Sequence, residues 1–417
     1  MLFLPGLRPG GRLDGENLTQ LSASRAVKAP SRVFLQVLIV ISLVCGALVE
    51  SALAQTTEPK TREEALRLER EKKQQAVTPN RPDALQRGLD YVEDRALHLL
   101  TRDGFYPKLG SLTTGSGFAF GVGYRDRTMF AQRGVAEVWT AGSLKKYWAV
   151  QARVAFPELA HRRLMTEVIA DLREYPRELF FGLGPDSRRQ DEIRFNLRKS
   201  EVTGRAGLRI APALMVGGNL GRFSPKTAAG DIDYLRSGGF VDVDYRQPLN
   251  ARRGGWYRID FSHFDDSDNG RQSFDRVDVD VRQYVGFFAE RRVIALRGWV
   301  SSTTPSDGSD GVPFYLMPFL GGNDSLRGFR NYRFRGPHAL LLQAEYRWEI
   351  WSGLDGAFFY DAGKVAMRRA DLNLKHLESD YGFGFRFNTD NGVVARVDAA
   401  FGSKEGKHLH IVFGGVF

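Results

Sequence analysis

The sequence has almost no cysteine and only one long hydrophobic run, and both absences narrow the possible classes of protein. Its 417 residues contain a single cysteine, Cys45, which lies inside the hydrophobic run at residues 33–48. If that run is removed with a targeting peptide, the mature chain has no thiol. Disulfide bonds and thiolate chemistry are then excluded, as suits an oxidising compartment. Val44 precedes Cys45 where a lipoprotein needs a small residue, which disfavours lipidation.

The hydrophobic run has the organisation of a secretory signal peptide. Basic residues at 25–32 precede it, and a small-residue cleavage site at residues 52–54 follows it, directly before Gln55. The run is shorter than the ~20 residues of a spanning helix, which disfavours the alternative of a transmembrane anchor. We therefore predict that residues 1–54 are a signal peptide with an N-terminal extension.

Residues 55–102 form a separate, charged segment. Its first part is rich in helix formers and has no apolar face wide enough to pack, which is typical of a solvated helix or a disordered tether. Its second part, residues 82–100, has apolar residues at helical spacing. We predict a periplasmic tail whose last helix rests on the end of the following domain or, alternatively, on the membrane surface.

The average hydropathy hides a regular alternation that begins at Gly104. Mean hydropathy is -0.32, a value that suits a soluble protein, but only every second residue of a transmembrane strand faces lipid. Apolar and polar residues alternate, for example, in residues 240–246, 277–282 and 383–388. A soluble β-sandwich would also alternate. The repeated charge on the polar face instead favours a wet lumen, and the aromatic-rich apolar face favours contact with lipid.

These patterns predict an all-β membrane protein, with a single antiparallel transmembrane barrel of about 16 strands over residues 103–417. An even number of strands places both ends of the barrel on the same side of the membrane. The longest connection, residues 302–338, follows the eleventh strand, and residues 224–237 and 362–380 are also predicted to be long loops. The strands are predicted at residues 105–112, 118–126, 134–142, 147–156, 164–175, 194–210, 214–223, 239–247, 256–264, 274–286, 293–301, 339–348, 354–360, 381–388, 393–401 and 408–417.

The longest connection contains the segment FLGGNDSLRGFRNYRFRGP at residues 319–337. Its paired glycines, Gly321 and Gly322, and the later Arg327-Gly328-Phe329 resemble the signature loop of the BamA/TamA superfamily of outer-membrane insertases. The segment FFGLGPDS at residues 180–187 and a C-terminal phenylalanine are similar to surface-antigen members of this group. The resemblance covers residues 104–417 and implies that the loop folds back into the lumen.

The resemblance also implies that the loop arginine meets acidic residues on strands twelve and thirteen, which match Glu345 and Asp361. Arginine offers a planar fork of donors that binds a carboxylate through two hydrogen bonds, and glycines let the backbone approach the wall. Glu345 shares a strand face with Gln343, and Asp361 shares one with Phe359, so both acids are able to point inward. The alternative is that Arg327 is an exposed loop residue and that both acids line a wet wall.

One departure from the family concerns its periplasmic POTRA domains. Residues 55–102 are shorter than a compact domain and lack strand patterns, so the chain resembles a member without them. The leading hypothesis is a barrel that assists insertion or export of proteins at the outer membrane. The expected partners are outer-membrane lipid and lipopolysaccharide, client outer-membrane proteins or a periplasmic accessory protein. The alternative is a passive pore or structural barrel that the loop plugs.

The proposed mechanism requires a weak seam between the first and last strands. Pro107 removes a backbone donor from the first strand, and Gly414 and Gly415 weaken pairing in the last strand, which ends at Phe417. The alternative is that Pro107 precedes the strand and that the glycines relieve crowding. No motif for catalysis, a metal, a cofactor or nucleic acid stands out, and we predict that the protein is not an enzyme.

Overall fold

The computed structural model describes residues 103–129, 134–228, 230–247, 252–351, 353–389 and 392–413. The predicted signal peptide and tail, residues 1–102, lie outside this part, as do Gly414, Gly415 and Phe417. Within it no helix is long and apolar enough to cross a membrane. Its helical segments are single turns, α5 (Leu159–Arg162), η2 (Arg189–Asp191), η3 (Phe314–Leu316) and η4 (Arg369–Asp371).

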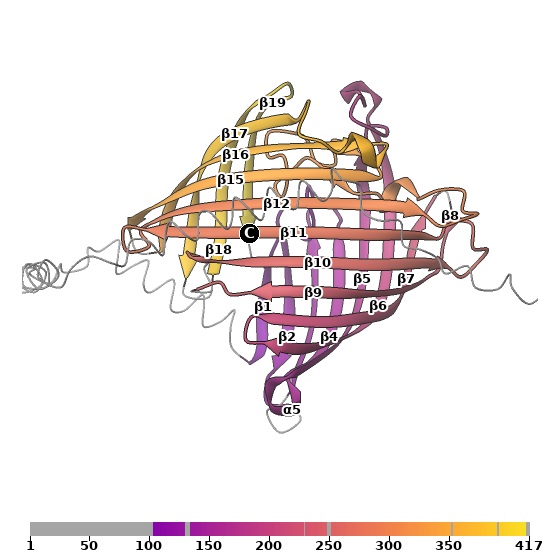
Figure 1. Ribbon diagram of the computed structural model, residues 1–417, viewed down its shortest axis with the longest axis horizontal. Helices are drawn as coiled ribbons and strands as arrows, with labels where there is room; N and C mark the ends of the chain where they lie inside the picture. Colours follow the sequence, from indigo (N-terminus) through magenta and orange to yellow (C-terminus); the bar gives the residue numbers. More distant parts are fainter. Residues whose placement is uncertain are drawn as a thin grey trace, which may run out of the picture.

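One sheet of 17 strands closes almost completely into a barrel (Figure 1). One member, β8 (Gly230–Asp231), only extends a hairpin, so 16 strands make the wall. The predicted antiparallel barrel of 16 strands is confirmed. Eleven wall strands precede the long connection, namely β1 (Gly104–Gly110), β2 (Ala119–Asp126), β3 (Val135–Ser143), β4 (Trp148–Glu158), β5 (Leu164–Phe180), β6 (Ile193–Ala211), β7 (Leu214–Thr227), β9 (Tyr234–Asp244), β10 (Gly254–Asp266), β11 (Phe274–Phe287) and β12 (Arg292–Pro305). Five follow it, namely β15 (His338–Trp351), β16 (Leu354–Ala366), β17 (Glu378–Thr389), β18 (Gly392–Ser403) and β19 (Gly406–Phe413).

The register of the strands separates an apolar outer face from a charged inner face. Ile259 of β10 lies opposite Val241 of β9 and Val279 of β11. Ile259 and Val241 are 45% and 38% exposed, on the outside of the wall. Their neighbours Arg258 and Asp260 point into the lumen, where they form an ion pair of 2.5 Å. Because each wall strand from β2 to β18 pairs with a neighbour on both sides, its backbone polar groups are satisfied without water, as a membrane requires.

The outer face is especially aromatic on the strands that follow the long connection. Six aromatic side chains of β16 and β17 are each more than 40% exposed there, namely Phe358, Tyr360, Tyr381, Phe383, Phe385 and Phe387. They lie in register, with Phe358 opposite Phe383 and Tyr360 opposite Tyr381. Exposure of so much apolar surface is unfavourable in water, and it is typical of a band that faces lipid.

Two of the predicted long loops are shorter than expected, because their flanking strands continue past the apolar residues. β7 extends to Thr227 and β9 begins at Tyr234, so the loop predicted at residues 224–237 is mostly a polar hairpin. β16 likewise extends to Ala366 and β17 begins at Glu378. Backbone pairing does not depend on side-chain polarity, so the alternation of apolar residues alone underestimated the length of these strands.

Candidate functional site

The connection between β12 and β15, residues 306–337, runs through the inside of the barrel. A short hairpin within it pairs β13 (Phe319–Leu320) with β14 (Phe334–Arg335). The chain turns after β13 at Gly321 and Gly322, whose φ angles are +110° and +104°. Other residues rarely adopt this left-handed region, and a Cβ atom on Gly321 would collide with the carbonyl oxygen of Arg330. The two glycines therefore permit the fold of the loop.

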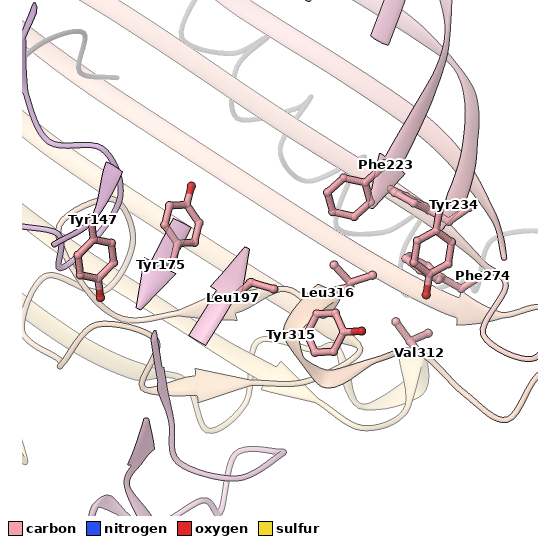
Figure 2. Close-up of a cluster of buried hydrophobic side chains, with 10 residues drawn as sticks. Tyr147, Tyr175, Leu197, Phe223, Tyr234, Phe274, Val312, Tyr315 and Leu316 are labelled. Atoms are coloured by element: carbon pink, nitrogen blue, oxygen red, sulfur yellow. The ribbon is translucent and has the colours of Figure 1, made fainter. Parts of the chain in front are cut away.

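The first half of this loop is held by apolar side chains. Val312, Tyr315 and Leu316 join a buried cluster on the inner wall (Figure 2). The wall residues of the cluster come from the end of the barrel at which β5, β7 and β10 finish, and are Tyr147, Tyr175, Leu197, Phe223, Tyr234, Phe264 and Phe274. Burial of a large apolar side chain contributes about 1.5–3 kcal/mol, so this cluster is a substantial anchor. It fixes the first half of the loop to the inner wall at that end of the barrel.

The second half is held by Arg327, which the structure buries completely. Its Nε and Nη2 atoms donate to the two carboxylate oxygens of Asp361, each at 2.7 Å. Its Nη1 atom lies 3.2 Å from Glu345 Oε2 and 3.4 Å from Asp398 Oδ2. The guanidinium carbon is 3.5 Å from the centre of the Phe359 ring. The structure thus brings the three charged residues singled out in the sequence into one contact, with Asp398 as a further acid.

Arg327 belongs to a larger cluster of charges without contact with solvent. Arg386 bridges Glu345 at 2.6 Å and Asp398 at 2.5 Å, and Arg347 binds the other oxygen of Glu345 at 2.6 Å. Each member is at most 4% exposed, and the cluster contains Arg327, Arg347, Arg386, Arg396, Glu345, Asp361, Asp380 and Asp398. The cluster thus combines four basic and four acidic side chains. Removal of one partner would leave a buried charge uncompensated, which typically costs about 3–5 kcal/mol.

The two residues after Arg327 fit the wall closely. A Cβ atom on Gly328 would lie 2.5 Å from the Cβ atom of Asp380, a distance that no side chain tolerates. Phe329 is 1% exposed and packs with Leu326 and Phe334 of the same loop. The glycine lets the loop reach the wall, and the phenylalanine fills the space beneath it.

Three further arginines tie the loop to distant parts of the barrel. Arg330 binds Glu192 at 2.6 Å, and Arg335 binds Glu178 at 2.7 Å. Arg333 pairs with Glu405, in the turn between β18 and β19, and donates to Ser187. The loop therefore crosses the lumen and joins the hairpin of β5 and β6 to the last strands.

The loop divides the lumen into a packed half and an open half. Beside β15–β18 the interior is filled by the buried charged cluster, unlike the alternative in which Arg327 is exposed and both acids line a wet wall. Beside β5–β12 a cavity of about 1040 Å³ remains. Its wall carries paired charges, such as Arg276 with Asp278 at 2.7 Å and Arg297 with Asp280 at 2.9 Å. The wet lumen inferred from the charged strand faces fits this half alone.

The first and last strands of the wall meet at a seam. β1 and β19 lie next to each other, but in the described part each pairs only with its other neighbour, β2 or β18. Pro107 lies within β1, opposite Val122 of β2. A pocket of about 540 Å³ opens beside the seam and is lined by residues 408–412 of β19 and by Ser111 and Thr113.

His410 of β19 connects this seam to the loop. Its Nε2 atom lies 2.7 Å from the backbone carbonyl oxygen of Arg327. His410 was not among the residues singled out in the sequence. Asp398 and Arg386 were also missed as members of the site. The alternation of β17 and β18 indicated that these charged residues face inward. The sequence does not give the register between strands, so it does not show which inward-facing residues lie side by side.

No group of three histidine, cysteine or acidic residues among the described residues is arranged to hold a metal ion.

Residues 247–413 match the family model for the Omp85 superfamily domain. The match spans β10–β12, the lumen loop and all five strands after it. It confirms the resemblance to barrels of the BamA/TamA type that the loop motif predicted.

Comparison with solved structures supports the same fold. BamA from Haemophilus ducreyi lacking POTRA domains 1–3 superposes with a TM-score of 0.57 and 12% identity, over 75% of this chain and 70% of that chain. CdiB from Escherichia coli superposes with a TM-score of 0.51 and 12% identity, over 74% of this chain and 61% of that chain. No curated protein matches the sequence.

Proposed function

We propose that this chain, an Omp85-type outer-membrane β-barrel, assists the insertion or export of other proteins at the outer membrane. The observation that carries this proposal is the seam. In the described part no ladder joins β1 to β19, whereas each other wall strand pairs on both sides. A free strand edge presents unpaired backbone donors and acceptors, which are a template for a strand of another chain.

The seam and the loop would act together in this function. The edge of β19 faces the pocket beside the seam, while His410 on the same strand contacts the loop at Arg327. The loop is fixed at both halves, by the apolar cluster and by the charged cluster. We infer that the loop keeps the lumen shut and holds β19 in place while the seam receives a client strand.

The orientation in the membrane follows from the predicted tail. Residues 55–102 would lie in the periplasm, and the long connections at the other end of the barrel would face the cell surface. We infer that a periplasmic accessory protein delivers clients to the barrel.

A strain that lacks the protein tests the proposal. We expect a defined set of outer-membrane or secreted proteins to fall in abundance while their transcripts stay constant. Wild-type protein should restore them, and quantitative proteomics of outer-membrane and culture fractions measures both effects. An unchanged proteome would contradict the proposal.

A second candidate, a pore that the loop plugs, is favoured by the open cavity beside β5–β12. Its charged wall would suit water and small ions once the apolar cluster at its end opened. The strain that lacks the protein distinguishes the two candidates. Loss of a pore would change the uptake of solutes and leave the abundance of outer-membrane proteins unchanged.

A further inference from the structure

The connection between β16 and β17, residues 367–377, folds over the outside of the barrel wall. We call this segment the flap. Its Leu372 is 6% exposed and packs against Val300 and Leu340. Both of these lie on the outer face, because Val300 pairs with the outward-facing Val279 and with Leu340. The flap thus covers a patch of wall that would otherwise face lipid or headgroups.

Polar contacts hold the flap in this position. The Nη2 atom of Arg369 lies 3.0 Å from Thr304 Oγ1 and 3.3 Å from Ser302 Oγ, both on the outer face of β12. Lys364 of β16 donates to Asn373 Oδ1 at 3.3 Å and to the carbonyl oxygen of Lys375 at 3.0 Å. The flap is therefore an ordered surface and not a free loop.

The flap and the strand beneath it carry positive charge without acidic partners. Among the described residues Lys364, Arg369 and Lys375 form no ion pair, and their contacts are with hydroxyl, amide and carbonyl groups. The two acids nearby are already engaged, since Asp371 binds Arg368 at 2.8 Å and Glu378 binds Lys404 at 3.2 Å.

Cations at the same end of the barrel on β6 and β7 behave differently. Arg198 pairs with Glu174 at 3.4 Å, and Lys226 pairs with Asp231 at 2.7 Å. The outer surface around β6 and β7 is thus neutralised by the protein itself. The flap is left with a local excess of positive charge that the chain does not compensate.

The flap also lies at the level where a membrane changes from acyl chains to headgroups. The last exposed aromatic residues below it are Tyr360 and Tyr381, and Lys364 stands four positions beyond Tyr360 on the same face of β16. Aromatic side chains of this kind mark the boundary of the apolar band. One apolar side chain of the flap, Leu374, is 55% exposed. The surface combines this apolar side chain with free cations.

We propose that Lys364, Arg369 and Lys375 bind the phosphate groups of lipopolysaccharide in the outer leaflet. Phosphate forms charge-assisted hydrogen bonds with lysine and arginine, and the acyl chains of the same lipid cover the aromatic band below. The lipid would pack the flap against the wall next to the strands that carry the charged cluster. This inference rests on the proposed orientation of the barrel, and it does not depend on whether the barrel inserts or exports proteins.

Binding of purified lipid A to the detergent-solubilised full chain tests the inference, with native mass spectrometry to count bound lipid. We expect the double variant Lys364→Gln/Lys375→Gln to weaken binding about thirtyfold, since each of the two basic residues near an anionic surface contributes roughly 1 kcal/mol. The variant leaves Arg369 and its hydroxyl contacts in place. Unchanged heat-modifiable migration on gels would show that the barrel is folded.

Three controls make the result decisive. Arg163→Gln removes an exposed cation in the turn at the opposite end of the barrel and should leave binding unchanged. Lipid A without phosphates should bind wild type at least as weakly as intact lipid A binds the double variant, which keeps Arg369, and phosphatidylglycerol should not compete. Equal binding by wild type and the double variant, or by lipid A with and without phosphates, would overturn the inference. So would an equal loss in Arg163→Gln, or equal competition by phosphatidylglycerol. The measurement in detergent stays valid if the proposed function fails.

Discussion

The backbone carbonyl oxygen of Arg327 lies 2.7 Å from Nε2 of His410, so the lumen loop and the last strand of the barrel are in direct contact. The same arginine holds Asp361 with two hydrogen bonds of 2.7 Å. One loop residue thus connects the middle of the wall to the strand at the seam. Any movement of β19 away from β18 or into the seam must either break this contact or move the loop together with the strand.

Replacement of Arg327 by alanine should release the second half of the loop. The ion pair is completely buried, so the loss lies at the upper end of the ~3–5 kcal/mol typical of a broken buried pair. The barrel should still fold, because its strand ladders are far more extensive than this contact. We expect new protease cleavage between Ser301 and His338, detected by mass spectrometry.

Two variants calibrate that result. Asp361→Asn should give a milder defect, because the amide oxygen still accepts one hydrogen bond from Arg327. Arg222→Ala, which removes an exposed ion pair with Asp233, should leave the loop protected. A loop as resistant in Arg327→Ala as in wild type would refute the anchoring role.

Gly328→Ala should loosen the loop by a different route. The added methyl group would collide with Asp380, whereas all charges of the cluster are retained. We expect protease sensitivity similar to that of Arg327→Ala. The double variant Gly328→Ala/Asp380→Gly makes room for the methyl group and should recover part of the protection. If the loop of Gly328→Ala is as resistant to protease as that of wild type, the wall at Asp380 moves to make room for the methyl group, and the close fit is not required.

The sequence predicted the barrel well, because alternation is a local property. The wall strands from β1 to β19 were found within a few residues, and the loop motif led to Arg327 and both of its predicted acids. Asp398 was missed, because it lies 71 residues from Arg327 and its approach depends on the register of several strands. The apolar anchor around Tyr315 and Leu316 was missed as well, since this stretch has no periodic pattern and its partners come from distant strands.

Conductance measurements test whether the loop closes the lumen. The apolar cluster and the charged cluster both block the interior, so intact protein in planar bilayers should show small and irregular openings. Deletion of residues 310–336 removes both anchors and should enlarge the conductance several-fold. A large and steady conductance of the intact protein would instead favour the pore.

Processing and orientation are open to direct measurement. Sequencing of the protein from outer-membrane fractions should find a mature N-terminus near Gln55, and a chain that retains residues 33–48 would contradict the signal peptide. Without Cys45, an introduced cysteine is the only thiol of the mature chain. Leu374→Cys in the flap should react with a membrane-impermeant maleimide on intact cells. Arg162→Cys, at the opposite end, should react only after permeabilisation.

The most direct test of the account is to lock the seam. Leu109→Cys in β1, combined in turn with Leu409→Cys and Ile411→Cys in β19, places thiols on the outer face at both sides of the seam. The matched control is Val122→Cys/Thr140→Cys, whose residues are direct partners in the closed ladder of β2 and β3. In the deletion strain, an oxidised seam pair should fail to restore the missing outer-membrane or secreted proteins, and reductant should restore them, while the control pair supports them in both states. Full restoration by a barrel whose seam is quantitatively crosslinked would contradict the account.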